Sequence, residues 1–198
     1  MNTRLSSIFL GILLILGTAD SHAQYQLGEP SFAEADDAKI AYWVIGEGEP
    51  ILLVHGFLGR ATSWLRYIDS MSKNNQLILV DLRGHGYSTN EKSVYTNKDA
   101  ASDMVAVLNA IGVNSVDGVG FSAGAMALFN MYVSYHDRLK SMAVIAGQLS
   151  YTDKTRELFK SFHPDIVSTS MLNSITTNHV RGEEQAKALL RYLQDFSE

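Results

Sequence analysis

The stretch Ser115–Ser134 reads SVDGVGFSAGAMALFNMYVS. It begins as a short apolar run ending at Gly118–Gly120, continues through Phe121–Gly124, and then becomes a long apolar segment with helical character. The pattern G-x-S-x-G therefore falls between an expected strand and an expected helix, which is the context that this motif requires. The stretch predicts a serine displayed on a sharp strand-to-helix turn.

The residue types around this turn suit nucleophilic chemistry. A serine on such a turn has strained backbone and an exposed hydroxyl, so Ser122 is the candidate nucleophile. Gly120 and Gly124 have no Cβ, which lets the strand and the helix approach closely. The first amides of a helix have no intrahelical acceptor and lie at the positive end of its dipole. The N–H of Ala123 can therefore stabilise an oxyanion formed when Ser122 attacks a carbonyl.

Two other interpretations of this stretch are possible from the sequence. One is a glycine-rich turn with an incidental serine. The other is a dinucleotide-binding loop, because Gly118, Gly120 and Ala123 also spell G-x-G-x-x-A. That loop requires an acidic residue at the end of the next strand. The next strand, Met142–Ile145, is followed by Ala146–Gln148 without a carboxylate, which disfavours a nucleotide. We expect no cofactor.

Composition narrows the class of protein. The chain has 198 residues, of which 46% are apolar, so it can form one domain with a sizeable core. Its net charge is −5 and it has no basic cluster interleaved with aromatics, which argues against a nucleic-acid partner. The absence of cysteine excludes disulfides and thiolate zinc sites, and the histidines lack metal-ligand spacing.

The N-terminus has the pattern of a secretory signal peptide. Arg4 precedes the apolar run Ile8–Leu16, and small residues at Ser21 and Ala23 define a cleavage site after Ala23. The run is shorter than the roughly 20 apolar residues that span a bilayer, so we expect no stable membrane anchor after cleavage. The mature chain is expected to be periplasmic or secreted.

Buried strands alternate with amphipathic helices along the chain, which predicts an α/β fold with a mostly parallel sheet and right-handed crossovers. A helix after the cap residue Thr96 ends at Gly112, and a helix over Ala125–Val133 is apolar nearly all round and is expected to be buried. The expected strands are Pro30–Ala35, Lys39–Ile45, Ile51–Val54, Gln76–Val80, Ser115–Gly120 and Leu139–Ala146.

Three motifs in order carry a family resemblance: HGFLG at His55–Gly59, DLRGHGYS at Asp81–Ser88 and GFSAG at Gly120–Gly124. The chain resembles the α/β-hydrolase fold superfamily, in its esterase, lipase and peroxidase-like branch, over roughly Ala33–Gln148. The resemblance implies a serine hydrolase whose substrate is a small, hydrophobic molecule with an ester or related acyl bond.

The resemblance also implies roles for the first two motifs. The N–H of Phe57 would join that of Ala123 in the oxyanion hole. His55, followed by Gly56, would hold its loop by hydrogen bonds and would not be the catalytic base. In the second motif, Asp81, Arg83 and His85 are interpreted as loop-structuring residues.

The chain after the last expected strand has a different character. Helices are expected over Tyr151–Phe162 and Glu183–Phe196, while Ile166–Asn178 is polar and weakly patterned. The resemblance makes this tail a helical lid. The expected organisation is a signal peptide at 1–23, an incomplete α/β-hydrolase core at 24–150, and a lid segment at 151–198.

The resemblance places the catalytic acid and then the histidine after the nucleophile, beyond two further strands. The chain ends 76 residues after Ser122 and has no apolar strand run after Ala146. We expect the acid and base beyond Glu198, in a hydrolase truncated after about the sixth strand. The strand Leu139–Ala146 would then be an open sheet edge.

The remaining titratable candidates are weaker. His136, His163 and His179 are interpreted as surface or lid residues, and Asp153 fits the start of a helix as well as it fits a catalytic acid. Alternative functions are an inactive hydrolase-fold fragment, a binding protein, or a cofactor-free peroxidase-like enzyme. The oligomeric state has no signal in the sequence.

Overall fold

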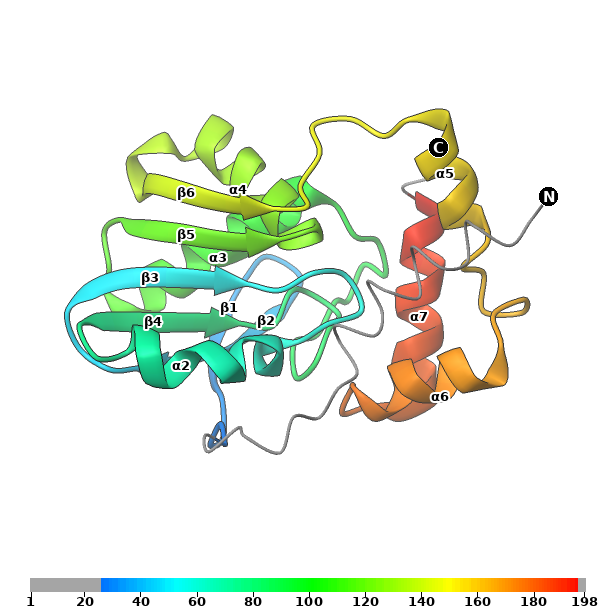
Figure 1. Cartoon of the computed structure of the whole chain (residues 1–198), viewed down its shortest axis with the longest axis horizontal. Coiled ribbons are helices and arrows are strands. Elements are labelled where there is room, and N and C mark those ends of the chain that lie inside the picture. The colour runs from blue at the N-terminus through cyan, green and yellow to red at the C-terminus, as the bar shows by residue number, and fades with distance from the viewer. Residues whose placement is uncertain (1–25, 196–198) are drawn as a thin grey trace.

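The computed structural model describes residues 26–195, so the predicted signal peptide lies outside the described part. Continuous apolar runs form the middle of a six-stranded sheet in the order β1-β2-β4-β3-β5-β6 (Figure 1). Strands β4, β3, β5 and β6 are parallel, and β1 and β2 are antiparallel to their neighbours. The bounds are β1 Ser31–Glu34, β2 Lys39–Ile45, β3 Glu49–Val54, β4 Asn75–Val80, β5 Val116–Phe121 and β6 Leu139–Ile145.

Helices cover both faces of the sheet. Helices α3 and α4 pack on one face with Leu52 and Val54, while η1 and α2 pack on the other with Leu53 and Leu77. The predicted α/β architecture, a mostly parallel sheet with crossover helices, is confirmed. The bounds on the sheet faces are η1 Ala61–Trp64, α2 Leu65–Met71, α3 Asn97–Ile111, α4 Ala123–Ser134 and η2 His136–Arg138.

Helix α3 begins and ends where its cap residues predict. The Thr96 hydroxyl accepts a hydrogen bond from the Asp99 N–H at 3.0 Å, which satisfies one of the unpaired amides of the first turn. Gly112 follows the last turn with φ of 73°, a left-handed conformation that glycine adopts without a Cβ penalty.

The prediction that the Ala125–Val133 helix is buried is wrong at its end. Tyr132 is 56% exposed and Val133 is 80% exposed. Apolar composition all round a helix predicts burial only where other elements cover every side, and no described element covers this turn. The neighbouring strand β6 is an edge of the sheet in the described part of the chain, as predicted, and its Val144 and Ile145 are exposed.

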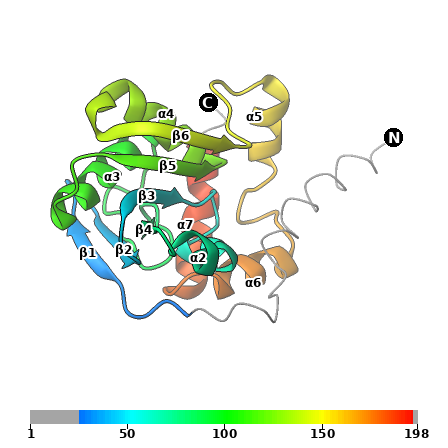
Figure 2. The ribbon, with the colours of Figure 1, turned by 60° about the vertical axis from the view of Figure 1, so that its left-hand side comes forward.

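Three helices follow the sheet: α5 Asp153–Lys160, α6 Thr169–Thr177 and α7 Gly182–Asp195. They lie beyond the ends to which the parallel strands point (Figures 1 and 2). Ala186, Leu189 and Leu190 of α7 are fully buried, as its amphipathic pattern predicts, whereas Phe196 lies outside the described residues. The sequence does not predict helix α6, because that stretch is polar with one buried apolar residue, Ile175. We call residues 151–195 the C-terminal helical segment.

Within residues 26–195, no helix combines the length and the apolar character needed to cross a bilayer.

A buried cluster of charged side chains joins the loop after β4, helix α3 and the turn between β1 and β2. The Arg83 guanidinium donates two hydrogen bonds of 2.7 Å to Asp103 on α3 and one of 3.1 Å to Asp37 between β1 and β2. All three side chains are at least nine-tenths buried. Loss of one member would leave uncompensated charge in a low-dielectric region, which costs more than the pairing itself contributes.

We predict that Arg83→Met lowers the free energy of unfolding by about 3–5 kcal/mol, because Asp103 and Asp37 lose their buried partner. The measurement is urea unfolding followed by circular dichroism. Lys160→Met is the matched control, since its ion pair with Glu157 is exposed and such pairs contribute about 0–1 kcal/mol. Equal losses in the two variants would contradict a structural role for the cluster.

Candidate active site

Ser122 occupies a one-residue turn between β5 and α4. Its backbone has φ of 52° and ψ of −113°, a region that residues with a Cβ rarely adopt. Its N–H donates to the Ile145 carbonyl of β6 at 2.8 Å, and its C=O accepts the first helical hydrogen bond from Met126 at 3.1 Å. The turn is thus fixed on both sides by backbone hydrogen bonds while the side chain leaves the sheet.

The two glycines of the motif are required by close backbone contacts. A Cβ on Gly120 would lie 2.6 Å from the Ala125 nitrogen, and a Cβ on Gly124 would overlap the Val54 carbonyl oxygen of β3. Gly56 in the next loop is similarly tight, since a Cβ on it would lie 2.7 Å from the Phe121 ring. These contacts bring the turn of Ser122 directly against the end of β3.

The loop after β3 is held by His55. Its Nδ1–H donates to the Gly56 carbonyl at 2.7 Å, and its Nε2 accepts from the Leu82 N–H at 3.0 Å. The two bonds together assign the proton to Nδ1. Burial lowers the pKa of His55 to about 4, which keeps the ring neutral. Both ring nitrogens are therefore engaged with backbone groups.

His85 holds the same loop from the other side. Its Nδ1–H donates to the Arg83 carbonyl at 3.0 Å, and its Nε2 accepts from the Leu58 N–H at 3.1 Å. Leu58 has φ of 64°, so the loop after β3, like the Ser122 turn, contains a residue with a strained backbone. The ring of Phe57, whose N–H is a predicted oxyanion donor, lies edge-on to His85 with centroids 4.7 Å apart.

Asp81, in the loop after β4, bonds both to that loop and to the end of the loop after β3. Its carboxylate accepts from the Ala61 N–H at 2.6 Å and from the Tyr87 N–H at 2.9 Å. Burial raises the pKa of Asp81 to about 6, although the two hydrogen bonds favour the charged carboxylate and act to lower it. A Cβ on Gly86 would overlap the same carboxylate, which explains the glycine in the second motif. Asp81 is a loop-structuring residue, as predicted.

His179 is predicted to lie at the surface or in the lid; it lies in the C-terminal helical segment and is buried there. It follows α6, is only 5% exposed, and lies with its ring centroid 5.8 Å from that of His85. Its Nδ1 accepts from the Gly86 N–H at 3.0 Å. Burial and the neighbouring His55 lower the pKa of His179 to about 3. No local pattern in the sequence marks this contact, because the partners are 93 residues apart.

The other candidates lie elsewhere. His136 and His163 are partly or largely exposed and face the neighbouring Asp137 and Asp165. Asp153 is in the first turn of α5, where a carboxylate favours the helix dipole. Within residues 26–195, no hydrogen bond joins Ser122 to a histidine, and no cluster of three His, Asp or Glu residues could hold a metal ion.

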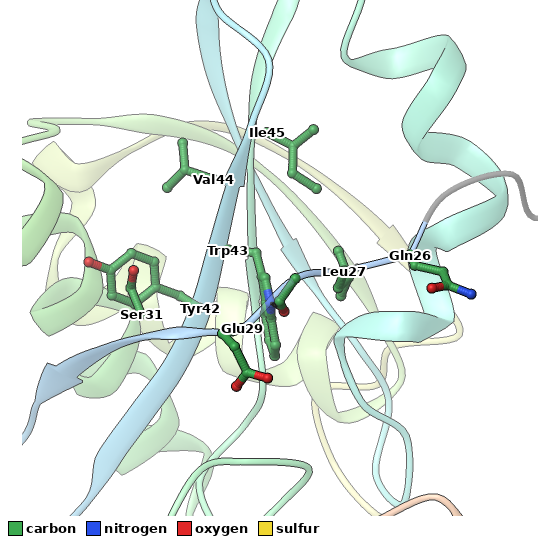
Figure 3. Close-up of a pocket in the computed structure, with 9 residues that line it drawn as sticks. Gln26, Leu27, Glu29, Ser31, Tyr42, Trp43, Val44 and Ile45 are labelled. Carbon is green, nitrogen blue, oxygen red and sulfur yellow. Dashed lines mark hydrogen bonds between the residues drawn. The ribbon is translucent and has the colours of Figure 1, made fainter.

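A hollow of about 330 Å³ lies away from this turn, between residues 26–31 and β2 (Figure 3). Its wall includes Trp43, whose indole N–H donates to the Gly28 carbonyl at 2.7 Å. Because β2 is three strands from β5 in the sheet, the hollow is separate from Ser122. The start of the described chain packs against the sheet here, and the residues that line the hollow include no cluster of titratable side chains.

A family model described as "alpha/beta hydrolase fold" matches residues 49–195, which include both loops and the Ser122 turn. The chain belongs to the α/β-hydrolase family.

Three relatives illustrate this membership. The chain is 31% identical over 116 residues to (E)-2-((N-methylformamido)methylene)succinate hydrolase of Acinetobacter baylyi, covering 59% of this chain and 44% of that protein. It is 30% identical to a putative carbamate hydrolase, RutD, of Azorhizobium caulinodans, with the same coverage. An esterase structure from Exiguobacterium antarcticum aligns with a TM-score of 0.71 at 17% identity, over 85% of this chain and 74% of that one. The chain spans less than half the length of the two curated relatives.

We predict that Gly124→Ala in this α/β-hydrolase chain lowers the free energy of unfolding by about 1–3 kcal/mol, because the new Cβ would overlap backbone atoms of β3 that cannot easily move. Gly28→Ala is the control, since a Cβ there meets nothing within 4 Å. Thermal unfolding of the two variants is the measurement. A Gly124→Ala protein as stable as Gly28→Ala would show that the close contact with β3 is dispensable.

We predict that stability falls as the pH is lowered from 6.5 toward 4. In that range the unfolded chain protonates His55, His85 and His179, whereas burial keeps the folded rings neutral. Each contributes up to about 1.4 kcal/mol per pH unit. Asp81, whose folded pKa is about 6, and Asp103, whose pKa is raised by burial, act in the opposite direction, whereas the lowered pKa of Asp37 acts in the same direction as the three histidines.

The measurement is urea unfolding at several pH values. His179→Gln keeps an acceptor for Gly86 but removes one titrating group, so it should flatten the pH dependence. A free energy of unfolding that is constant between pH 6.5 and 4 would contradict the prediction.

Proposed function

We propose that this chain carries the nucleophile and oxyanion hole of a serine hydrolase acting on ester or related acyl bonds. The observation that supports it best is the strained backbone of Ser122, with φ of 52° at the junction of β5 and α4. Such strain persists only where surrounding structure fixes it, and it clusters at functional sites. The glycine contacts with β3 supply that fixation.

In the proposed reaction, Ser122 Oγ attacks the substrate carbonyl carbon and its proton passes to a base. The negative charge that develops on the carbonyl oxygen is stabilised by the N–H groups of Ala123 and Phe57. Ala123 is the first residue of α4, where amide groups have no intrahelical acceptor. The base then gives this proton to the leaving group as the tetrahedral intermediate collapses, which expels the alcohol or amine and leaves an acyl-enzyme that water hydrolyses.

We place the base and its acid outside the described residues. His55, His85 and His179 each accept a hydrogen bond from a backbone N–H, and burial keeps their pKa values low. A general base needs a lone pair directed at the nucleophile and a pKa near the working pH. None of the three meets both conditions.

The substrate is proposed to be a small, hydrophobic acyl compound. The named relatives comprise a hydrolase of an N-methylformamido compound, a putative carbamate hydrolase and an esterase, so acyl bonds to oxygen or nitrogen are the common chemistry. The C-terminal helical segment, beyond the carboxyl ends of the strands, is proposed to act as the lid of the site. The N-terminal signal pattern supports export, so we propose a periplasmic or secreted enzyme.

The test is covalent labelling with a fluorophosphonate, whose phosphorus is attacked by activated serines. We expect labelling at Ser122, identified by mass spectrometry, and at least a hundredfold less in Ser122→Ala. Ser141→Ala, a serine on the exposed edge strand, is the matched control and should label normally. Added imidazole can substitute for an absent base. Labelling that survives in Ser122→Ala, or no labelling even with imidazole, would overturn the assignment.

A further inference from the structure

Side chains of residues 178–185 dock the C-terminal helical segment onto the two loops beside Ser122. Gln185 donates to the carbonyls of Gly84 and Gly86 at 2.8 and 2.9 Å, and Arg181 donates to the Ser88 carbonyl at 2.8 Å. These bonds, with the His179 contact described above, anchor the segment on the loop after β4.

Asn178 contacts a different loop from the one that Gln185 and Arg181 contact. Its Nδ2–H donates to the Leu58 carbonyl at 3.0 Å, across 120 residues of sequence. Leu58 belongs to the loop after β3 and directly follows Phe57. Asn178 therefore bonds to the loop with the proposed oxyanion donor, and the neighbouring His179 also interacts with the Leu58 backbone.

The backbone of Leu58 is held on both sides. Its N–H donates to His85 Nε2 and its carbonyl accepts from Asn178. These two bonds fix a leucine at φ of 64°, a conformation that side chains with a Cβ leave when their surroundings permit. His85 is in turn packed against His179. Both partners of Leu58 are thus supported by the C-terminal helical segment.

We propose that Asn178 is a positioning residue for the oxyanion hole, so that docking of the C-terminal helical segment holds the Phe57 N–H in its productive orientation. This inference rests on the proposed serine-hydrolase function. Without the Asn178 bond, Leu58 is free to relax toward negative φ, and the adjoining Phe57 peptide shifts with it. The hydrogen bonds of Arg181 and Gln185 remain, so the segment stays docked while the loop loosens.

The first measurement is hydrogen exchange of residues 55–61, which needs no catalysis. The reporters are the N–H groups of Leu58, bonded to His85, and Gly59, bonded to the Gly56 carbonyl at 3.0 Å. We expect Asn178→Ala to speed their exchange at least tenfold. Asn173→Ala, an exposed residue of α6, is the matched control and should leave it unchanged. Unchanged exchange in Asn178→Ala would overturn the inference.

Asn178→Asp separates the hydrogen bond from packing. It keeps the side-chain shape but loses the donor and places a carboxylate oxygen against the Leu58 carbonyl. We expect exchange at least as fast as in Asn178→Ala. Exchange as slow as in the unsubstituted chain would show that shape alone holds the loop, which would also overturn the inference.

The second measurement is the rate of fluorophosphonate labelling at Ser122 as a function of probe concentration. An oxyanion hole acts on the transition state, so Asn178→Ala should lower the limiting rate about tenfold and leave the half-saturating concentration unchanged. Faster exchange with an unaltered limiting rate would refute the positioning role. If the unsubstituted chain is not labelled, the proposed function fails, and the exchange data still decide whether docking holds the loop.

Discussion

The approach of α4 to the end of β3 is the constraint on which the rest of the site depends. Gly124 lies so close to the Val54 carbonyl that no side chain fits between helix and strand. Strand β5 enters the helix through the single residue Ser122, which has positive φ, and Gly124 in the first turn of α4 lies against the Val54 and His55 carbonyls at the start of the loop after β3. The Ser122 turn and the loop after β3 are therefore packed against each other, and a shift of one would displace the other.

Most of the fold follows from patterns that act over short distances in the sequence. The apolar runs ending at Val54 and Val80 predict central parallel strands, and Thr96 and Gly112 predict the ends of α3, because caps and burial leave local signatures. The Ser122 turn is predictable for the same reason, since its glycines lie within two residues of it. The exposed end of α4 is not predictable, because composition cannot say which neighbours a helix has.

The contacts of the C-terminal helical segment cannot be predicted in this way. Asn178, His179 and Gln185 reach backbone groups that are 93 to 120 residues away in the sequence. Any amide or imidazole at these positions looks like an ordinary polar residue of a surface helix. Even α6 has only a weak signal, because its apolar face is limited to Met171, Leu172 and Ile175, of which the first two are partly buried. Polar side chains that bond to backbone depend on where the backbone goes, which is a property of the whole fold.

The roles of the histidines likewise depend on contacts that only the whole fold creates. A serine turn invites a search for a base, and His55, His85 and His179 all lie within the two loops or against them. Each one, however, uses its lone pair to accept a backbone N–H, which is possible only for a neutral ring. Burial enforces neutrality by disfavouring the charged form, and so it makes these rings dependable acceptors at the cost of basicity. Because burial keeps His85 neutral, its Nε2 accepts the N–H of the strained Leu58 at pH values where an exposed histidine would carry a proton on both nitrogens.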